Sequence, residues 1–252
     1  PPPFPRYGFI LSPASASSNG GSRATQVSIP PSELARRSAL EGKRAGKWVA
    51  MLKEHEAAAA ADPALLGRAQ SGLCAGDPEL LKKRVRKGVP DIVRGRVWNL
   101  LGGVPGLMRA NPDKYAILLE KSATFVPSRD IRETIMRDIN RTFPKHAMFA
   151  SAGPGQNSLR NVLVAYSLYD EEVGYCQGLG FIAALFLTYM PEEEAFWQIV
   201  SVMNRSPTNI RLLYIDGMPL AQKTLYVGDR LIKKFFPKLH KHLQRECCDI
   251  SM

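Results

Sequence analysis

Two polar side chains, Asp138 and Arg141, stand one helical turn apart in the segment 135–144. Residues at i and i+3 of a helix are neighbours, so this carboxylate and guanidinium can form an ion pair. The apolar positions of the segment fall on a different arc. Pro144 lies just past the predicted helix, so we expect Arg141 to project from the C-terminal end of that helix. The pair is either an ordinary surface salt bridge, worth less than about 1 kcal/mol, or a functional one.

A second polar side chain, Gln177, lies between glycines in the segment Gly174-Tyr175-Cys176-Gln177-Gly178-Leu179-Gly180. This segment separates two strongly apolar stretches, where a polar residue is unexpected. Glycine allows a backbone to come close to a ligand or partner. The alternative is a turn between two helices in which Gln177 caps a backbone carbonyl.

Helical periodicity must position these segments, because it dominates the chain from residue 88 onward. Predicted helices cover 94–101, 131–143, 159–169, 179–190, a segment that starts at Pro191, and 219–236. The helices at 159–169 and 179–190 are apolar nearly all round, which predicts central positions. In the helix at 219–236, we expect Leu220, Val227 and Leu231 to face the core. No strand alternation is convincing, so the predicted fold class is all-α.

Composition and motifs exclude several function classes. Hydrophobic residues make up 45% and charged residues 23% of the 252 residues, which is typical of a globular chain. The sequence has no P-loop, no G-x-S-x-G and no H-E-x-x-H motif. Its four cysteines form no C-x-x-C pair, so no metal site is expected.

The net charge of +11 permits nucleic acid, an anionic membrane or an acidic protein as partner. Aromatic residues are not interleaved with the basic runs, so we expect no nucleic-acid binding. The basic run 82–87 is either a solvated helix face or a contact to an acidic partner or membrane.

A third segment, Lys87 to Trp98, changes how the first two are interpreted. It resembles the opening motif of the TBC domain family, the Rab GTPase-activating proteins, whose Arg-x-x-x-Trp hallmark is matched by Arg94 and Trp98. The segment at 135–144 is similar to the family's I-x-x-D-x-x-R motif, and the segment at 174–180 to its Y-x-Q-G motif. All three occur in the family's order.

The resemblance implies an activator of a Rab-type GTPase in its GTP form, not an enzyme in its own right. It makes Arg141 an arginine finger and Gln177 a glutamine finger. Asp138, Tyr175 and Gly178 would support these two, and Arg94 and Trp98 would be structural. GTP and Mg²⁺ would belong to the partner, so no cofactor is expected. The alternative is a non-catalytic Rab-binding module or scaffold.

Three regions are predicted along the chain. Residues 1–31 are rich in Pro, Ser and Gly and are expected to form a disordered tail. Residues 32–86 are a basic helical lead-in, and 87–252 are the TBC domain, which stops before the family's closing helices. With no visible signal peptide, the expected location is cytoplasmic, with recruitment to membranes in trafficking left open.

Overall fold

The computed structural model describes residues 30–62, 73, 77–124, 129–150, 153–206, 208–246 and 248. Within these ranges every regular element is a helix, so the all-α prediction is confirmed. Of the tail predicted at 1–31, residues 1–29 lie outside the described residues, as does most of the loop predicted at 64–78. None of the described helices combines the length and apolarity needed to cross a bilayer.

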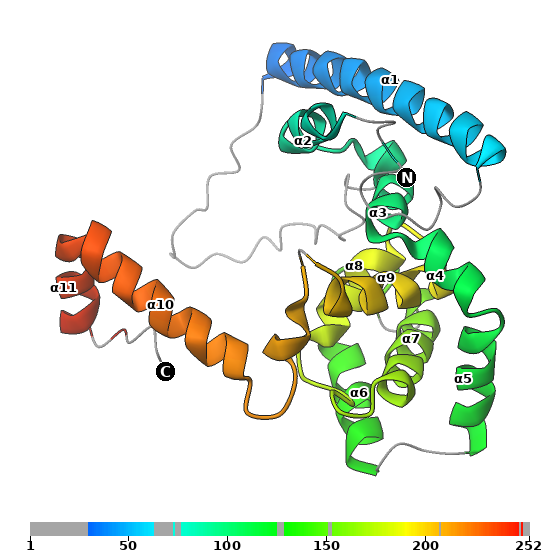
Figure 1. Ribbon diagram of the computed structural model, residues 1–252. Helices are drawn as coiled ribbons and strands as arrows, with labels where there is room; N and C mark the ends of the chain where they lie inside the picture. Colours follow the sequence, from blue (N-terminus) through cyan, green and yellow to red (C-terminus); the bar gives the residue numbers. More distant parts are fainter. Residues whose placement is uncertain are drawn as a thin grey trace, which may run out of the picture.

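The core is built around α7 (Gly155–Tyr169), which packs against four neighbouring helices (Figure 1). These are α5 (Lys114–Thr124), α6 (Arg129–Arg141), α8 (Leu179–Leu187) and α9 (Glu192–Asn204). Leu159, Val162, Leu163 and Tyr166 of α7 are completely buried. The central position predicted for this apolar segment is therefore confirmed, because a helix that is apolar all round requires neighbours on several sides.

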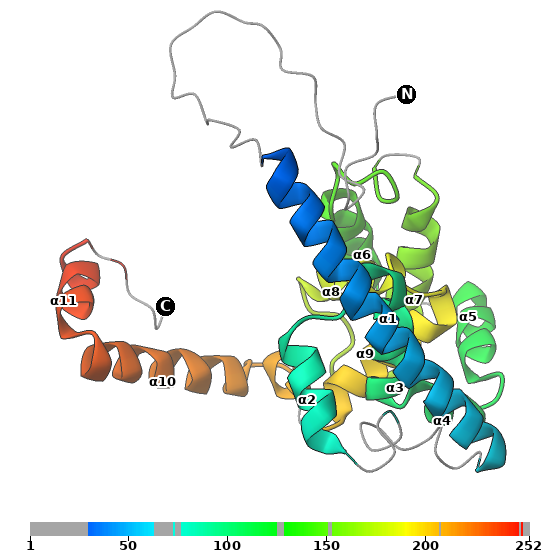
Figure 2. The ribbon, with the colours of Figure 1, turned by 90° about the horizontal axis from the view of Figure 1, so that it is seen from above.

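A second, smaller core joins the lead-in to this body. It lies between α1 (Pro31–Ala61), α2 (Pro78–Arg86) and α3 (Asp91–Gly102). Trp48, Met51 and Leu52 share one face of α1 and are buried against α2 and α3. The short helix α4 (Val104–Ala110) then leads from α3 toward α5 (Figure 2).

Some predicted helix boundaries shift in the structure. α8 ends at Leu187, three residues before the predicted end. Pro191 is the N-cap of α9, and the acids Glu192–Glu194 lie in its first turn. Their negative charges interact favourably there with the positive end of the helix dipole. α6 runs from Arg129 to Arg141, so it ends two residues before the predicted end at Phe143.

One prediction about the core is wrong. α10 (Pro219–Phe235) and α11 (Pro237–Arg245) form an arm that projects from the body, joined to it through the short 3-10 helix η2 (Ile210–Leu213) (Figures 1 and 2). α10 has no buried residue: Val227 is 44% and Leu231 is 49% exposed, and Leu220 is half-buried. Amphipathic periodicity reveals an apolar face, but it does not specify what covers that face.

Candidate functional site

The site begins at the C-terminal end of α6, where Arg141 is the last helical residue. Its guanidinium NH2 lies 2.6 Å from Oδ1 of Asp138. The two side chains differ sharply in exposure, because Arg141 is 48% exposed whereas Asp138 is only 6% exposed. The interpretation as an ordinary surface salt bridge is therefore wrong for the carboxylate, which is buried and holds a half-exposed arginine at the surface.

A second donor reaches the same carboxylate from far along the chain. The hydroxyl of Tyr175 donates to Oδ2 of Asp138 at 2.7 Å, across 37 residues of sequence. Burial, and next the hydrogen bond to Asp138, raise the pKa of Tyr175 well above its usual value, so the phenol stays protonated and donates. Asp138 thereby connects the end of α6 to the loop that carries Gln177.

The loop also contacts α6 through its backbone. A Cβ placed on Gly180 would lie 3.1 Å from the Thr142 hydroxyl oxygen, so a residue without a side chain allows the start of α8 to approach the end of α6. Gly178 takes φ +102°, a conformation that favours glycine, and it is the N-cap of α8. These glycines allow the turn in which Gln177 stands.

Gln177 itself is exposed, and its side chain makes no hydrogen bond to any residue the structure describes. The N-terminus of α8 has no side-chain cap. The interpretation of Gln177 as a helix cap therefore finds no hydrogen bond to rest on. Only two peptide units separate it from Tyr175, so its Cα lies within about 7 Å of the Tyr175 Cα.

A second ion pair holds the beginning of this loop, and sequence reasoning missed it. Asp170 caps α7 and accepts two hydrogen bonds from Arg211 of η2, at 2.7 and 2.8 Å, and one from the Tyr166 hydroxyl at 3.2 Å. Burial alone would raise the pKa of Asp170, but the hydrogen bonds from Arg211, the Val173 N–H and Tyr166 together lower it below its usual value. No local spacing links Asp170 to a partner 41 residues away.

Arg94 and Trp98 form a separate cluster in which they meet Tyr189, just after α8. The Arg94 guanidinium carbon lies 5.0 Å from the Tyr189 ring centroid and 5.9 Å from that of Trp98. Its NH1 donates to the Tyr189 hydroxyl at 2.5 Å, and its NH2 to the carbonyl of Val89 at 2.8 Å. The cluster fastens α3 to the core.

Sequence reasoning also missed Gly95 and Tyr189 in this cluster. A Cβ on Gly95 would lie 2.0 Å from the Tyr189 carbonyl oxygen, so α3 can approach only without that atom. A signal was present in the sequence, because glycine inside a helix is unfavourable and usually has a packing reason.

Of the predicted site residues, the structure brings together Asp138, Arg141 and Tyr175, with Gln177 and Gly178 on the attached loop.

A guanidinium with spare donors, and an uncommitted amide on a loop that is bonded to the same Asp138 carboxylate through Tyr175, suit the recognition of an anionic group and a water molecule on a partner. Arg141 uses one nitrogen on Asp138, which leaves further N–H donors of its planar fork available. Gln177 offers both a donor and an acceptor. Asp138 also reduces the number of orientations open to Arg141, so less entropy is lost when a ligand binds.

Comparison with known proteins identifies a family. The sequence model of the Rab-GTPase-TBC domain matches residues 91–252. The Caenorhabditis elegans "Rab GTPase-activating protein tbc-11" is 43% identical over 171 residues, which are 66% of this chain and 18% of that protein. Mouse "Carabin" is 33% identical over 246 residues, 95% of this chain and 46% of its own length. The chain thus spans less than half of either relative.

Solved structures agree on the fold. The Chlamydomonas flagellar RabGAP TBC domain superposes with a TM-score of 0.60 at 25% identity, covering 86% of this chain and 65% of that one. The Ypt/Rab-GAP domain of Gyp1p superposes with a TM-score of 0.56 at 23% identity, covering 68% of this chain and 64% of that one. The helical arrangement described above is therefore that of known domains of this kind.

Proposed function

Because the chain belongs to the Rab-GTPase-TBC domain family, we propose that it accelerates GTP hydrolysis by a Rab-type small GTPase in its GTP-bound form. The chain acts as an activator: the partner binds the nucleotide and Mg²⁺, and the chain contributes side chains to the partner's site. The relative named "Rab GTPase-activating protein tbc-11" supports this class of activity. One observation carries the proposal: the buried Asp138 carboxylate connects the Arg141 helix to the Gln177 loop.

Arg141 has the role of an arginine finger. During phosphoryl transfer, negative charge spreads over the phosphate oxygens, and a guanidinium donates forked hydrogen bonds to them. Asp138 holds the side chain by one nitrogen, so the remaining N–H groups point to the partner without a large loss of side-chain entropy. Arginine fingers accelerate GTP hydrolysis by about 10³–10⁵.

Gln177 has the role of orienting the attacking water. Its carbonyl oxygen accepts a hydrogen bond from the water, and its amide can donate one to a neighbouring acceptor. The side chain is exposed and uncommitted, as this role requires. Tyr175 and Gly178 are positioning residues, because the first anchors the loop and the second sets its turn.

The arginine role is tested by measuring single-turnover GTP hydrolysis by a panel of Rab GTPases at a saturating concentration of this chain. Arg141→Lys keeps the charge but loses the planar fork, so we expect the stimulated rate to fall by about 10³-fold or more. Arg137→Lys is the matched control, because Arg137 is exposed one turn earlier on α6 and its side chain donates to Glu133 and Thr134 rather than to Asp138. Near-full stimulation by Arg141→Lys would contradict the finger role.

The glutamine role is tested by crossing two sites. Gln177→Ala is combined with removal of the switch glutamine of the GTPase, each alone and together. We expect Gln177→Ala to abolish most of the stimulation and the GTPase variant to remain responsive. The opposite pattern would show that the GTPase orients its own water. Binding of a Rab without any stimulation would identify the chain as the non-catalytic module instead.

A further inference from the structure

A cavity of about 510 Å³ lies between α1 and α2, in the part of the chain that precedes the family-matched segment. Ten residues line it: Leu40, Lys43, Arg44, Lys47, Trp48, Leu80, Lys83, Arg84, Lys87 and Gly88. None of them belongs to the cluster around Arg141. The basic run at 82–87 contributes three of these residues, and α1 contributes three more cations, which the sequence did not associate with that run.

The six cations of this α1–α2 pocket have no acidic counterpart in its lining. Among the described residues, none of the six forms an ion pair with a carboxylate. Two acids of these helices form ion pairs outside the lining: Glu33 with Arg36 and Arg37, and Glu79 with Lys82. Glu41 of α1 has a partner of its own and does not line the pocket. Six like charges around one cavity repel one another, so an anion that enters it gains from all of them.

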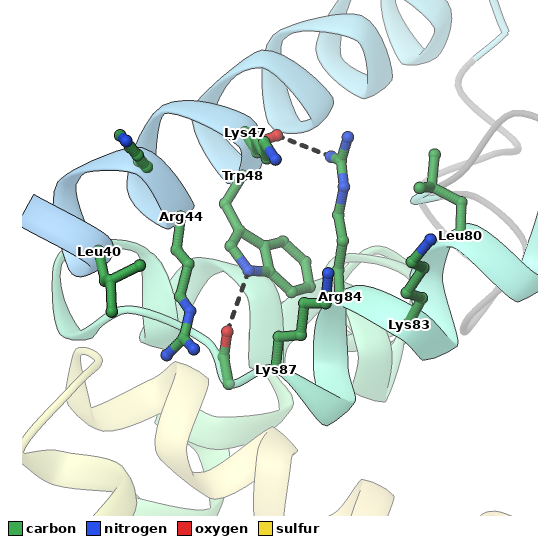
Figure 3. Close-up of a pocket in the computed structure, with 10 residues that line it drawn as sticks. Leu40, Arg44, Lys47, Trp48, Leu80, Lys83, Arg84 and Lys87 are labelled. Carbon is green, nitrogen blue, oxygen red and sulfur yellow. Dashed lines mark hydrogen bonds between the residues drawn. The ribbon is translucent and has the colours of Figure 1, made fainter.

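The walls of the pocket are held in place independently of any ligand (Figure 3). The Arg84 guanidinium donates to the carbonyl oxygen of Lys47 at 2.7 Å and so joins α2 to α1. The Trp48 indole N–H donates to the carbonyl oxygen of Gly88 at 3.3 Å. Trp48 is buried, so the floor of the pocket is apolar and fixed.

Exposed leucines accompany the cations. Leu40 is 43% and Leu80 is 37% exposed, one on each wall. Leucine beside lysine and arginine is typical of surfaces that rest on a bilayer, where apolar side chains enter the acyl boundary and cationic heads stay with the phosphates. A duplex nucleic acid does not fit a cavity of this size, and Trp48 is too buried to stack on a base.

From these observations we propose that the α1–α2 pocket binds the headgroup of a membrane lipid that carries several phosphate groups. A headgroup with several phosphates can neutralise most of the six cations around the cavity, whereas a lipid with a single negative charge leaves most of these cations without a counterion. The exposed leucines favour the lipid over a free polyphosphate, because they gain contact only at a bilayer. This inference does not depend on the GTPase activity, and it can fail while that activity holds.

The experiment measures binding of the full chain to phosphatidylcholine vesicles that contain a phosphatidylinositol bisphosphate. Vesicles with phosphatidylserine at the same net charge are the comparison. The test variant is Lys43→Gln/Lys47→Gln/Lys83→Gln, which changes three exposed side chains of the pocket. Each lysine near an anionic surface contributes about a five-fold factor, so we expect about a hundred-fold weaker binding.

The matched control removes the same charge from the arm, as Lys233→Gln/Lys238→Gln/Lys241→Gln, all exposed residues outside the pocket. We expect this variant to lose less than about three-fold. An equal loss in both variants, or equal binding to the two kinds of vesicle, would overturn the proposal, since net charge alone would then explain the attraction.

Two further arms identify the source of the phosphates. Leu40→Ser/Leu80→Ser is expected to weaken vesicle binding by about ten-fold or more, because each leucine loses its contact with the acyl boundary. Soluble inositol trisphosphate is expected to bind the unmodified chain more weakly than the vesicles do. Equally tight binding of the soluble compound would show a free polyphosphate site, and tighter binding of duplex DNA would show a nucleic-acid site; either result overturns the membrane assignment.

Discussion

Replacing Tyr175 by Phe tests the connection between the two proposed fingers most directly. The change removes one hydroxyl, which donates to Oδ2 of Asp138 at 2.7 Å, and leaves the aromatic ring in place. Asp138 keeps its ion pair with Arg141. The variant therefore unties the Gln177 loop from α6 without deleting either finger.

The size of the effect follows from the bond that is lost. A hydrogen bond to a charged, buried carboxylate contributes about 1.5–3 kcal/mol. If this bond holds the loop in its productive arrangement, its loss lowers the population of that arrangement by about ten-fold to a hundred-fold. We expect the stimulated rate of GTP hydrolysis at saturating chain to fall by that factor, while the affinity for the GTPase changes little.

The assay is single-turnover hydrolysis over a range of chain concentrations, which separates the maximal rate from half-saturation, together with thermal unfolding. Tyr166→Phe is the matched control, because the Tyr166 hydroxyl also donates to a carboxylate, that of Asp170, which keeps its two hydrogen bonds from Arg211 when the hydroxyl is removed. Each variant should lower the melting temperature, by about 3–12 °C for Tyr175→Phe and somewhat less for Tyr166→Phe, whose bond is longer at 3.2 Å.

Only Tyr175→Phe should lower the maximal rate by the factor above. Equal rate losses in the two variants would refute the reasoning, because a general loss of stability would then account for both. An unchanged maximal rate in Tyr175→Phe would refute it as well, since the loop would be held in place by other contacts.

Two further predictions concern stability. Asp170→Asn should lower the free energy of unfolding by about 2 kcal/mol at neutral pH. Because the folded pKa of Asp170 is lowered, this contribution is lost as the pH falls below about 4. Urea unfolding should therefore depend less on acid pH in the variant than in the unmodified chain, and an equal pH dependence of the two would contradict the role of the ion pair. Gly95→Ala should lower the free energy of unfolding by about 3 kcal/mol, because its Cβ would lie 2.0 Å from a backbone carbonyl oxygen. Gly228→Ala, where a Cβ would have nothing within 4 Å, should instead raise it by about 0.5–1 kcal/mol. Similar effects of the two changes in thermal unfolding would contradict the close approach.

Local spacing in the sequence determined the helices and the pairs within them. The all-α class and the contact between Asp138 and Arg141 follow from a repeat of 3.6 residues. The central position of α7 follows from its apolar circumference. These features depend on residues within a few turns of one another, which is why sequence alone predicts them.

The tertiary structure decided every feature that joins distant segments. The bond from Tyr175 to Asp138 spans 37 residues, and that from Arg94 to Tyr189 spans 95. Neither hydrogen bond follows from a motif, because each depends on how two distant segments are oriented and how closely they approach. The burial of Asp138, which distinguishes a structural carboxylate from a surface one, has the same origin.

The outward arm and the α1–α2 pocket show the same division. The sequence predicted an apolar face on α10 and a basic run on α2, since both are local patterns. It placed the first in the core, although the structure leaves that face exposed, and it did not bring the second beside the cations of α1. A periodic pattern specifies which side chains share a face of one helix; only the packing of the whole chain decides what that face meets.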